Sequence, residues 1–258
     1  MIVSSQNTGF KKALVLFTKN PAAEFFHKRI SSEINKTLQK VFFNQTIDII
    51  LNAKKNADFD LIISTDSLEL KDRFNHKLIQ CEIIKQNGKD FGDRFNNTYK
   101  GVFALGYREA VFIGNDSPDL TSELIAKSFS ELETKSSIVI GSSFDGGFYL
   151  LGVKDYQKNL FDKIEWNSNK VLARLLINIR KNGKRIFYLP QLADIDDRKS
   201  FNFWLRTKTK TAKYFLSLII YLLFANQKFI FFNPPFNKES YCSRRISQKS
   251  PPFLQLKF

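Results

Sequence analysis

Three short acidic runs in the sequence could each bring a carboxylate to a ligand. The first is the run Gly-Asn-Asp-Ser-Pro-Asp-Leu at residues 114–120, which directly follows the apolar run 110–113. This order places Asp116 at the carboxyl end of a buried strand, where a carboxylate can hold a hard divalent cation against substrate phosphates. The same residue types also favour a plain turn, and the run by itself supports both interpretations equally.

The second run, Phe-Asp-Gly-Gly-Phe-Tyr at residues 144–149, sets Asp145 beside two glycines. Gly146 and Gly147 have no side chains and would let the backbone approach a ligand closely, so we predict that both contact the substrate. Asp-Gly is also a common signal for a tight turn between two strands. Judged by itself, this run favours the turn.

The third run, Asp-Ile-Asp-Asp at residues 194–197, follows another apolar run. Alternate carboxylates such as Asp194 and Asp196 are good oxygen ligands for Mg²⁺ or Mn²⁺. The alternative is that one of the acids caps a helix starting near Arg198. A cap needs only one of the three acids, so the pattern leans towards a metal site.

The elements that must position these runs alternate between strands and helices. Helical spacing of apolar residues predicts helices, and Asp90, Thr121 and Ser168 are expected as their N-caps. This alternation predicts a mainly parallel sheet covered on both faces, with ligands outside the carboxyl ends of its strands. The expected strands are 13–17, 60–65, 80–85, 110–113, 137–140, 147–152 and 185–189, and the expected helical segments are 22–53, 90–106, 122–133 and 168–181.

The composition argues for an ordinary globular protein in a reducing compartment. The 258 residues contain two cysteines, Cys81 and Cys242, too few and too far apart for a disulfide framework or a metal motif. Residues 1–12 contain no apolar segment typical of a secretory signal. We therefore expect a cytoplasmic protein.

The charge is distributed unevenly along the chain. Residues 204–258 contain ten Lys or Arg and one acid, Glu239, and so carry +9 of the net +15. The body is only mildly basic, which suits an anionic small substrate, and no nucleic-acid motif is present. We therefore predict no nucleic-acid partner.

The tail differs enough from the body to suggest a division into domains at 1–203 and 204–258. Residues 214–225 are apolar on all sides but are followed by Asn-Gln-Lys, which is short for a membrane span. Two interpretations stay open: a peripheral contact with the inner face of the membrane, or a helix packed on the domain. The prolines and scattered charges after residue 233 predict disorder.

The order of these segments resembles a bacterial family of GT-A-like transferases found beside radical-SAM and selenodomain proteins, some of them labelled arsenosugar-biosynthesis glycosyltransferases. That family is distantly similar to molybdenum-cofactor and phospholactate nucleotidylyltransferases. The resemblance implies a Rossmann-like GT-A fold, a three-layer sandwich around a mainly parallel sheet. The matching positions are residues 17–21, 86–95, 114–120 and 145–152, then Phe161, Ile164, 166–168 and 194–196.

The resemblance also implies a metal-dependent glycosyl or nucleotidyl transfer. A nucleotide sugar or nucleoside triphosphate would lie across the carboxyl ends of the first strands. Asp116 and Asp196, with Asp194 beside them, would hold Mg²⁺ or Mn²⁺ on its phosphates, while Asp145 would orient the acceptor or act as a base.

The sequence departs from the family pattern near the N-terminus. Family members carry a glycine and then Lys-Thr-Arg, where this chain has Glu24 and the run His-Lys-Arg at 27–29. Lys19 and Arg29 are the remaining phosphate-binding candidates, although Lys19 fits a solvated strand-end lysine equally well. The alternative hypothesis is therefore a degenerate, non-catalytic family member that binds a nucleotide or a protein partner.

Overall fold

The computed structural model describes residues 11–19, 32–68, 80–195 and 198–207. Within them, seven strands form one sheet in the order β3-β2-β1-β4-β6-β5-β7. Every neighbouring pair is parallel except the two made by β6, which runs antiparallel to β4 and β5. The predicted mainly parallel sheet is confirmed. The strands are β1 (Lys12–Phe17), β2 (Asp60–Thr65), β3 (Cys81–Lys85), β4 (Glu109–Ile113), β5 (Ile138–Ser142), β6 (Phe148–Lys154) and β7 (Ile186–Tyr188).

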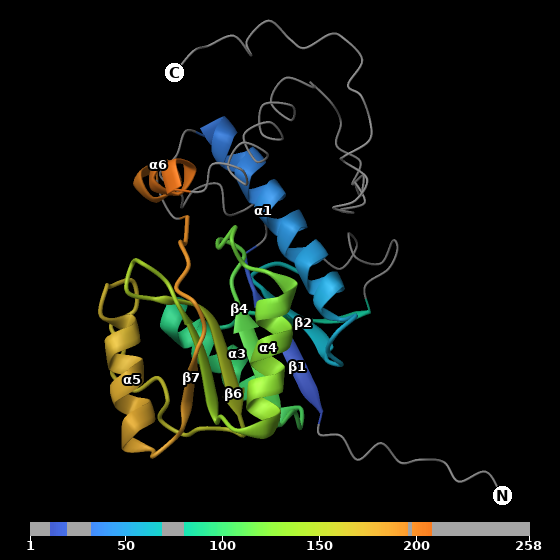
Figure 1. Ribbon diagram of the computed structural model, residues 1–258, viewed down its shortest axis with the longest axis vertical. Coiled ribbons are helices and arrows are strands. Elements are labelled where there is room, and N and C mark those ends of the chain that lie inside the picture. Colours follow the sequence, from blue (N-terminus) through green and yellow to red (C-terminus); the bar gives the residue numbers. More distant parts are fainter. Residues whose placement is uncertain (1–10, 20–31, 69–79, 196–197, 208–258) are drawn as a thin grey trace, which may run out of the picture. The chain divides into compact units, whose positions relative to one another are not determined.

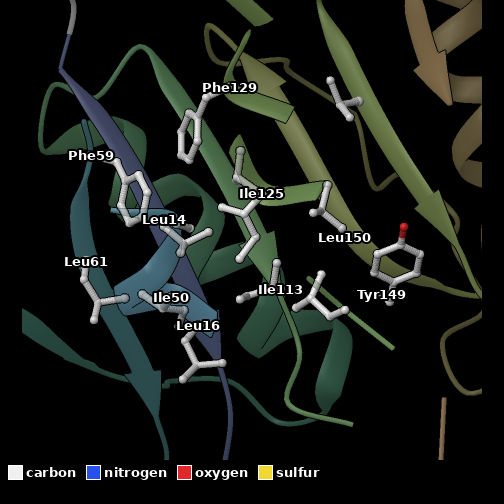
Figure 2. Packing of buried hydrophobic residues seen from close by; sticks show 14 of the residues in the cluster. Leu14, Leu16, Ile50, Phe59, Leu61, Ile113, Ile125, Phe129, Tyr149 and Leu150 are labelled. Carbon is white, nitrogen blue, oxygen red and sulfur yellow. The ribbon is translucent and has the colours of Figure 1, made fainter. Parts of the chain in front are cut away.

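Helices cover both faces of this sheet, as expected from strands that are apolar on both sides. In β1, Leu14 and Leu16 belong to one hydrophobic core, while Ala13 and Val15 belong to the other. Helices α1 (Ser32–Ala53) and α4 (Ser122–Thr134) supply the first core, and α3 (Phe91–Ala104) and α5 (Val171–Lys181) the second. Figure 1 shows α4 in front of the sheet and α3 behind it. Figure 2 shows the first core, where aliphatic strand residues meet side chains of α1 and α4.

Two of the three predicted helix caps are confirmed. Asp90 accepts a hydrogen bond from the Asp93 N–H at the start of α3, and Thr121 accepts one from the Leu124 N–H at the start of α4. The predicted cap at Ser168 is wrong, because α5 begins at Val171 after Lys170. The Ser168 hydroxyl instead donates to the Glu165 carbonyl, which shapes a turn before the helix.

The predicted domain boundary at residues 203 and 204 falls inside helix α6 (Arg198–Thr207). Trp204 of this helix is fully buried, and Phe201 is 8% exposed. The apolar run 214–225 lies outside the described residues. Among the helices that the structure describes, none is long and apolar enough to cross a membrane.

Candidate functional site

A pocket of about 570 Å³ opens at the carboxyl edge of the sheet. The ends of β1, β3 and β4 contribute to it, together with the start of β6, the residues before α5 and the segment after β7. Its position agrees with the rule that open parallel sheets bind ligands beyond the carboxyl ends of their strands. The predicted site residues that line this pocket are Lys19, Asp116, Asp145, Gly147 and Asp194.

The Asp116 carboxylate is positioned by the loop that leaves β4. It folds back over Gly114, where a Cβ atom would lie 2.8 Å from Asp116 Oδ1. Glycine at 114 therefore leaves room for the carboxylate. The neighbouring side chains Asn115 and Ser117 are buried, so the loop is well anchored on both sides of the half-buried Asp116.

Asp194 reaches the same place from the segment after β7. The Ile195 N–H donates to the Asp116 carbonyl at 2.9 Å, which ties the two loops together. The Ser117 hydroxyl donates to the Asp194 carboxylate. The structure thus brings together two acidic runs that are about 80 residues apart in sequence.

The carboxylates of this pocket influence one another. Burial raises the pKa of Asp194 well above its ordinary value, and the negative charges of Asp116 and Asp145 raise it further. The hydrogen bond from the Ser117 hydroxyl offsets part of this shift, but no described Lys or Arg does. The cost of ionising Asp194 therefore comes first from burial and then from the two neighbouring acids, and a cation beside Asp194 would offset it.

Asp145 lies in the tight turn between β5 and β6. Its Oδ1 accepts hydrogen bonds from the Ser143 hydroxyl at 2.6 Å and from the Gly147 N–H at 2.9 Å. Gly146 has φ +91°, and a Cβ atom there would lie 2.2 Å from the Asn169 carbonyl oxygen. The turn therefore requires glycine at 146, which is not one of the pocket-lining residues, whereas Gly147 lines the pocket.

The part of the pocket formed by α3 and the segment before α5 is aromatic and basic. Phe91, Arg94 and Trp166 line it and are each half-buried. The Trp166 indole packs on Gly92, where a Cβ atom would lie 2.2 Å from Cδ1 of the ring. Any side chain at 92 would displace the tryptophan.

Two buried amides also line the pocket. Gln86 donates through Nε2 to the carbonyls of Thr18 and Ser64, at 3.0 and 2.9 Å, and so joins the ends of β1, β2 and β3. Its Oε1, and Nδ2 of Asn115, have no hydrogen-bond partner among the described residues. A bound ligand is a natural partner for such atoms.

Several of these residues were not predicted from sequence. Gln86, Arg94 and Trp166 belong to segments that carry the family resemblance, but no role was assigned to them. Asn115 and Ser117 looked like turn formers. Gln86 could have been predicted as a site residue, because it directly follows an expected strand and ligands bind at the carboxyl ends of parallel strands.

Two predicted residues, Arg29 and Asp196, lie outside the described residues. Within the described part of the chain, no group of three His, Cys, Asp or Glu side chains is arranged to hold a metal ion. The chemistry of the donors nevertheless fits Mg²⁺ or Mn²⁺, since Asp116 and Asp194 are oxygen donors that repel each other when both are ionised.

Comparison with protein families gives a match over part of the chain. Residues 48–168, which include Asp116 and Asp145, match the family described as "Uncharacterized protein conserved in bacteria (DUF2064)". No curated protein sequence matches the chain.

Two solved structures illustrate the structural likeness. One is a Desulfovibrio desulfuricans G20 protein provisionally assigned as a nucleotide-diphospho-sugar transferase, with 23% identity, a TM-score of 0.63, and coverage of 82% of this chain and 98% of that chain. The other is 4-diphosphocytidyl-2C-methyl-D-erythritol synthase from Anaerococcus prevotii DSM 20548, with 12% identity, a TM-score of 0.52, and coverage of 80% and 96%. The predicted Rossmann-like, GT-A-like α/β fold is confirmed.

Proposed function

We propose that this protein is a metal-dependent nucleotidyl- or glycosyltransferase that uses a nucleotide sugar or a nucleoside triphosphate as its donor. The observation that carries the proposal is the meeting of Asp116, Asp145 and Asp194 in one pocket at the carboxyl edge of the sheet. Their mutual repulsion raises the pKa of Asp194, after the larger effect of burial. Such an arrangement costs stability and is typical of a functional site.

Asp116 and Asp194 would hold the divalent cation, with Asp196 as a third donor proposed from the sequence. A cation there would offset the negative charge that develops on the departing phosphate group. The Ser117 hydroxyl donates to Asp194 and favours the ionised carboxylate that such a cation requires, against the larger effects of burial and of Asp116. Lys19, at the end of β1, would neutralise donor phosphates further along the pocket.

Asp145 would act on the acceptor. Its Oδ1 is fixed by Ser143 and by the Gly147 N–H, so the carboxylate has one orientation. Oδ2 is then the atom that would accept a hydrogen bond, and finally the proton, from an acceptor hydroxyl. Gly147, which lines the pocket beside this carboxylate, would allow the acceptor to approach the backbone.

Binding of nucleotides is the first test of this proposal. The full chain is screened by thermal unfolding with nucleotide sugars and nucleoside triphosphates, each with and without Mn²⁺. The resemblance to sugar-transferring family members places nucleotide sugars first. A true donor at 100 times its Kd stabilises the protein by about 2.7 kcal/mol, and we expect most of this gain to require Mn²⁺.

The variant Asp116→Asn then separates catalysis from folding. We expect turnover of the identified donor to fall by roughly a hundredfold or more, the scale on which loss of one electrostatic stabiliser acts, while the melting temperature without ligand stays the same or rises because repulsion with Asp194 is removed. Asp119→Asn is the matched control, since Asp119 belongs to the same acidic run but does not line the pocket.

The outcomes distinguish the two functional hypotheses. Mn²⁺-dependent binding without any turnover would favour the non-catalytic alternative. Turnover by Asp116→Asn within a few-fold of the parent chain would remove Asp116 from the mechanism.

A further inference from the structure

An exposed aromatic pair lies beside the pocket. Phe144 is 60% exposed, the largest value for a large apolar side chain in the described part of the chain. Its ring meets that of Phe203 of α6, which is 52% exposed, with the centroids 6.1 Å apart. Single exposed apolar side chains are normal on a protein surface, but two in contact, from segments 59 residues apart in sequence, form a patch that indicates a contact surface.

The fold does not depend on the Phe144 ring. The backbone of its turn is fixed by other bonds: the Phe144 N–H donates to the Leu192 carbonyl at 3.2 Å, and Gln191 Nε2 donates to the Ser143 carbonyl at 3.1 Å. Among the described residues, Phe144 is part of neither hydrophobic core. A polar side chain could therefore take its place in the turn, and the exposed ring is better explained by a partner outside the domain.

Helix α6 presents opposite faces to the domain and to the solvent. Phe201 and Trp204, three residues apart, are buried, so their face packs on the domain. Phe203 lies on the outer face, with Lys199 four residues before it and Arg206 three residues after it, and both basic residues are exposed. Residues at these spacings lie on one side of a helix. An aromatic ring between two basic side chains is typical of helices that lie on membrane surfaces.

The charge of this face is complementary to an anionic surface. Helix α6 contains three basic residues and no acid. Residues 208–213 add three lysines and no acid, and the run 214–225 that follows them in sequence is apolar. An acidic protein surface would match the basic residues but would not account for an apolar run directly after them. Exposed rings, basic residues and an apolar run together fit a lipid surface with anionic headgroups.

We propose that Phe144 and Phe203, flanked by Lys199 and Arg206, form a docking face with which the folded domain binds an anionic lipid surface peripherally. The two rings enter the headgroup region, and the two basic side chains contact the lipid phosphates. Neither a nucleotide nor a metal ion takes part in this contact, so it is independent of the proposed function. Docking would place the pocket beside the membrane, because Phe144 directly precedes the pocket-lining Asp145.

Co-sedimentation of the full chain with lipid vesicles tests the docking face. Vesicles of phosphatidylcholine mixed with phosphatidylglycerol are anionic, and vesicles of phosphatidylcholine alone are the neutral comparison. We expect binding to the anionic vesicles that is weakened by salt, and little binding to the neutral ones.

Phe144→Ser and Phe203→Ser should each weaken this binding roughly tenfold, because burial of an aromatic ring contributes on that scale. Their melting temperatures should stay close to that of the parent, since both rings are more than half exposed. Leu105→Ser is the matched control. Leu105 is 45% exposed between the end of α3 and the start of β4, at the edge of the sheet where the parallel strands begin, and its variant should bind like the parent.

The basic residues are tested separately. Lys199→Gln and Arg206→Gln should each weaken binding to anionic vesicles roughly fivefold, which corresponds to about 1 kcal/mol for a basic residue near an anionic surface. Lys135→Gln, an exposed residue just after α4, is the control and should leave binding unchanged. Phe144→Trp should keep the affinity, because tryptophan is favoured at membrane interfaces, and lipids with brominated acyl chains should quench its added fluorescence.

Three results would overturn the proposal. If the full chain binds neither kind of vesicle, or binds neutral vesicles as tightly as anionic ones, the face does not recognise an anionic membrane. If both serine variants bind like the parent, the segment after residue 207 makes the contact without the domain. If the chain ignores vesicles but forms dimers that both serine variants abolish, the exposed rings pack against a second copy of the chain.

Discussion

The sheet has an amino edge, where its parallel strands begin, and a carboxyl edge, where they end. Buried charge is compensated by opposite charge at the first and not at the second. At the amino edge, Glu109 of β4 is almost completely buried, and Lys154 of β6 lies 3.3 Å from its carboxylate. Burial raises the pKa of Glu109, and Lys154 and then Lys12 offset that rise. At the carboxyl edge, the charges that act on Asp194 are those of Asp116 and Asp145, so they add to the effect of burial.

We interpret the paired charges at the amino edge as structural and the unpaired negative charge around Asp194 as available to a ligand. Lys154 also donates to the carbonyls of Leu132 and Glu133 at the end of α4, so the amino edge is a local hydrogen-bonded network. The carboxyl edge has serine hydroxyls in place of a lysine. Hydroxyls orient a carboxylate without neutralising it, and the net negative charge stays available to a cation.

The first prediction concerns helix α6, which follows the last acidic run at the carboxyl edge. Helix α6 begins directly after the run 194–197, and its Trp204 is fully buried. We propose that the α/β domain extends beyond residue 203 to the end of α6. A chain ending at residue 207 should melt like the full chain. A chain ending at residue 203 loses the indole and should lose about 3–5 kcal/mol of stability, the cost typical of deleting a buried Trp.

Chemical denaturation of the three chains measures this difference. Equal stability of the chains ending at 203 and 207 would show that Trp204 contributes little, and would support the boundary predicted from sequence. Loss of stability in the chain ending at 207 would show that part of the segment after residue 207 belongs to the core.

The second prediction concerns the amino edge. Lys154→Met leaves the Glu109 carboxylate buried without its partner, and should cost about 3–5 kcal/mol, the scale for breaking one side of a buried ion pair. Nucleotide binding at the other edge should be unchanged under folding conditions. Lys127→Met is the matched control, because its pair with Glu131 within α4 has a more exposed lysine and should be worth only about 0–1 kcal/mol.

The double variant Glu109→Gln, Lys154→Met completes this test. It removes both charges and should recover most of the stability that Lys154→Met loses. A Lys154→Met protein as stable as the parent would mean that Glu109 is neutral or hydrated in the native state, and the contrast between the two edges would lose its basis.

Much of this architecture could be read from the sequence, because apolar runs and capping residues are local signals. The strand at 110–113 and the helix after Thr121 are examples, and the order of strands and helices placed Asp116 at the carboxyl edge. The turn favoured at residues 144–147 implies an antiparallel β5–β6 pair, which the structure contains, but the pairing of β6 with β4 was not predicted, since a turn does not define the other neighbour of the strand that follows it. The contact of Asp194 with Ser117 depends on pairing between distant segments, and no local pattern encodes it.

The site was harder to predict than the fold for a physical reason. A turn and a ligand site use the same residue types, as the segment from Ser143 to Gly147 demonstrates. Here the Asp145 carboxylate closes the turn with one oxygen and lines the pocket as well, so the two interpretations offered by the sequence are compatible. Arg94 was overlooked because an arginine on a helix is usually a solvated residue.

The last and smallest effect concerns pH and Mn²⁺ at the acidic edge. Because the pKa of Asp194 is raised in the folded protein, the native state holds this proton more tightly than the unfolded chain does. The metal-free protein should therefore lose stability as pH rises from the ordinary aspartate range through the raised pKa. Mn²⁺ binds the ionised carboxylate, so the stabilisation that it gives should grow over the same range, to about 1.4 kcal/mol when free Mn²⁺ is ten times its Kd.

Two variants make this pH experiment specific to the site. Asp194→Asn should remove part of the pH-dependent loss in the metal-free protein and most of the Mn²⁺ effect. Asp48→Asn is the control, because burial raises the pKa of Asp48 to about 6 on α1, away from the pocket. It should also reduce the pH dependence, but it should leave the response to Mn²⁺ intact. Thermal melts from pH 5 to pH 8 with and without Mn²⁺ measure both. If Mn²⁺ stabilises the Asp194→Asn protein as much as the parent at every pH, the cation binds elsewhere and the carboxyl edge is not a metal site.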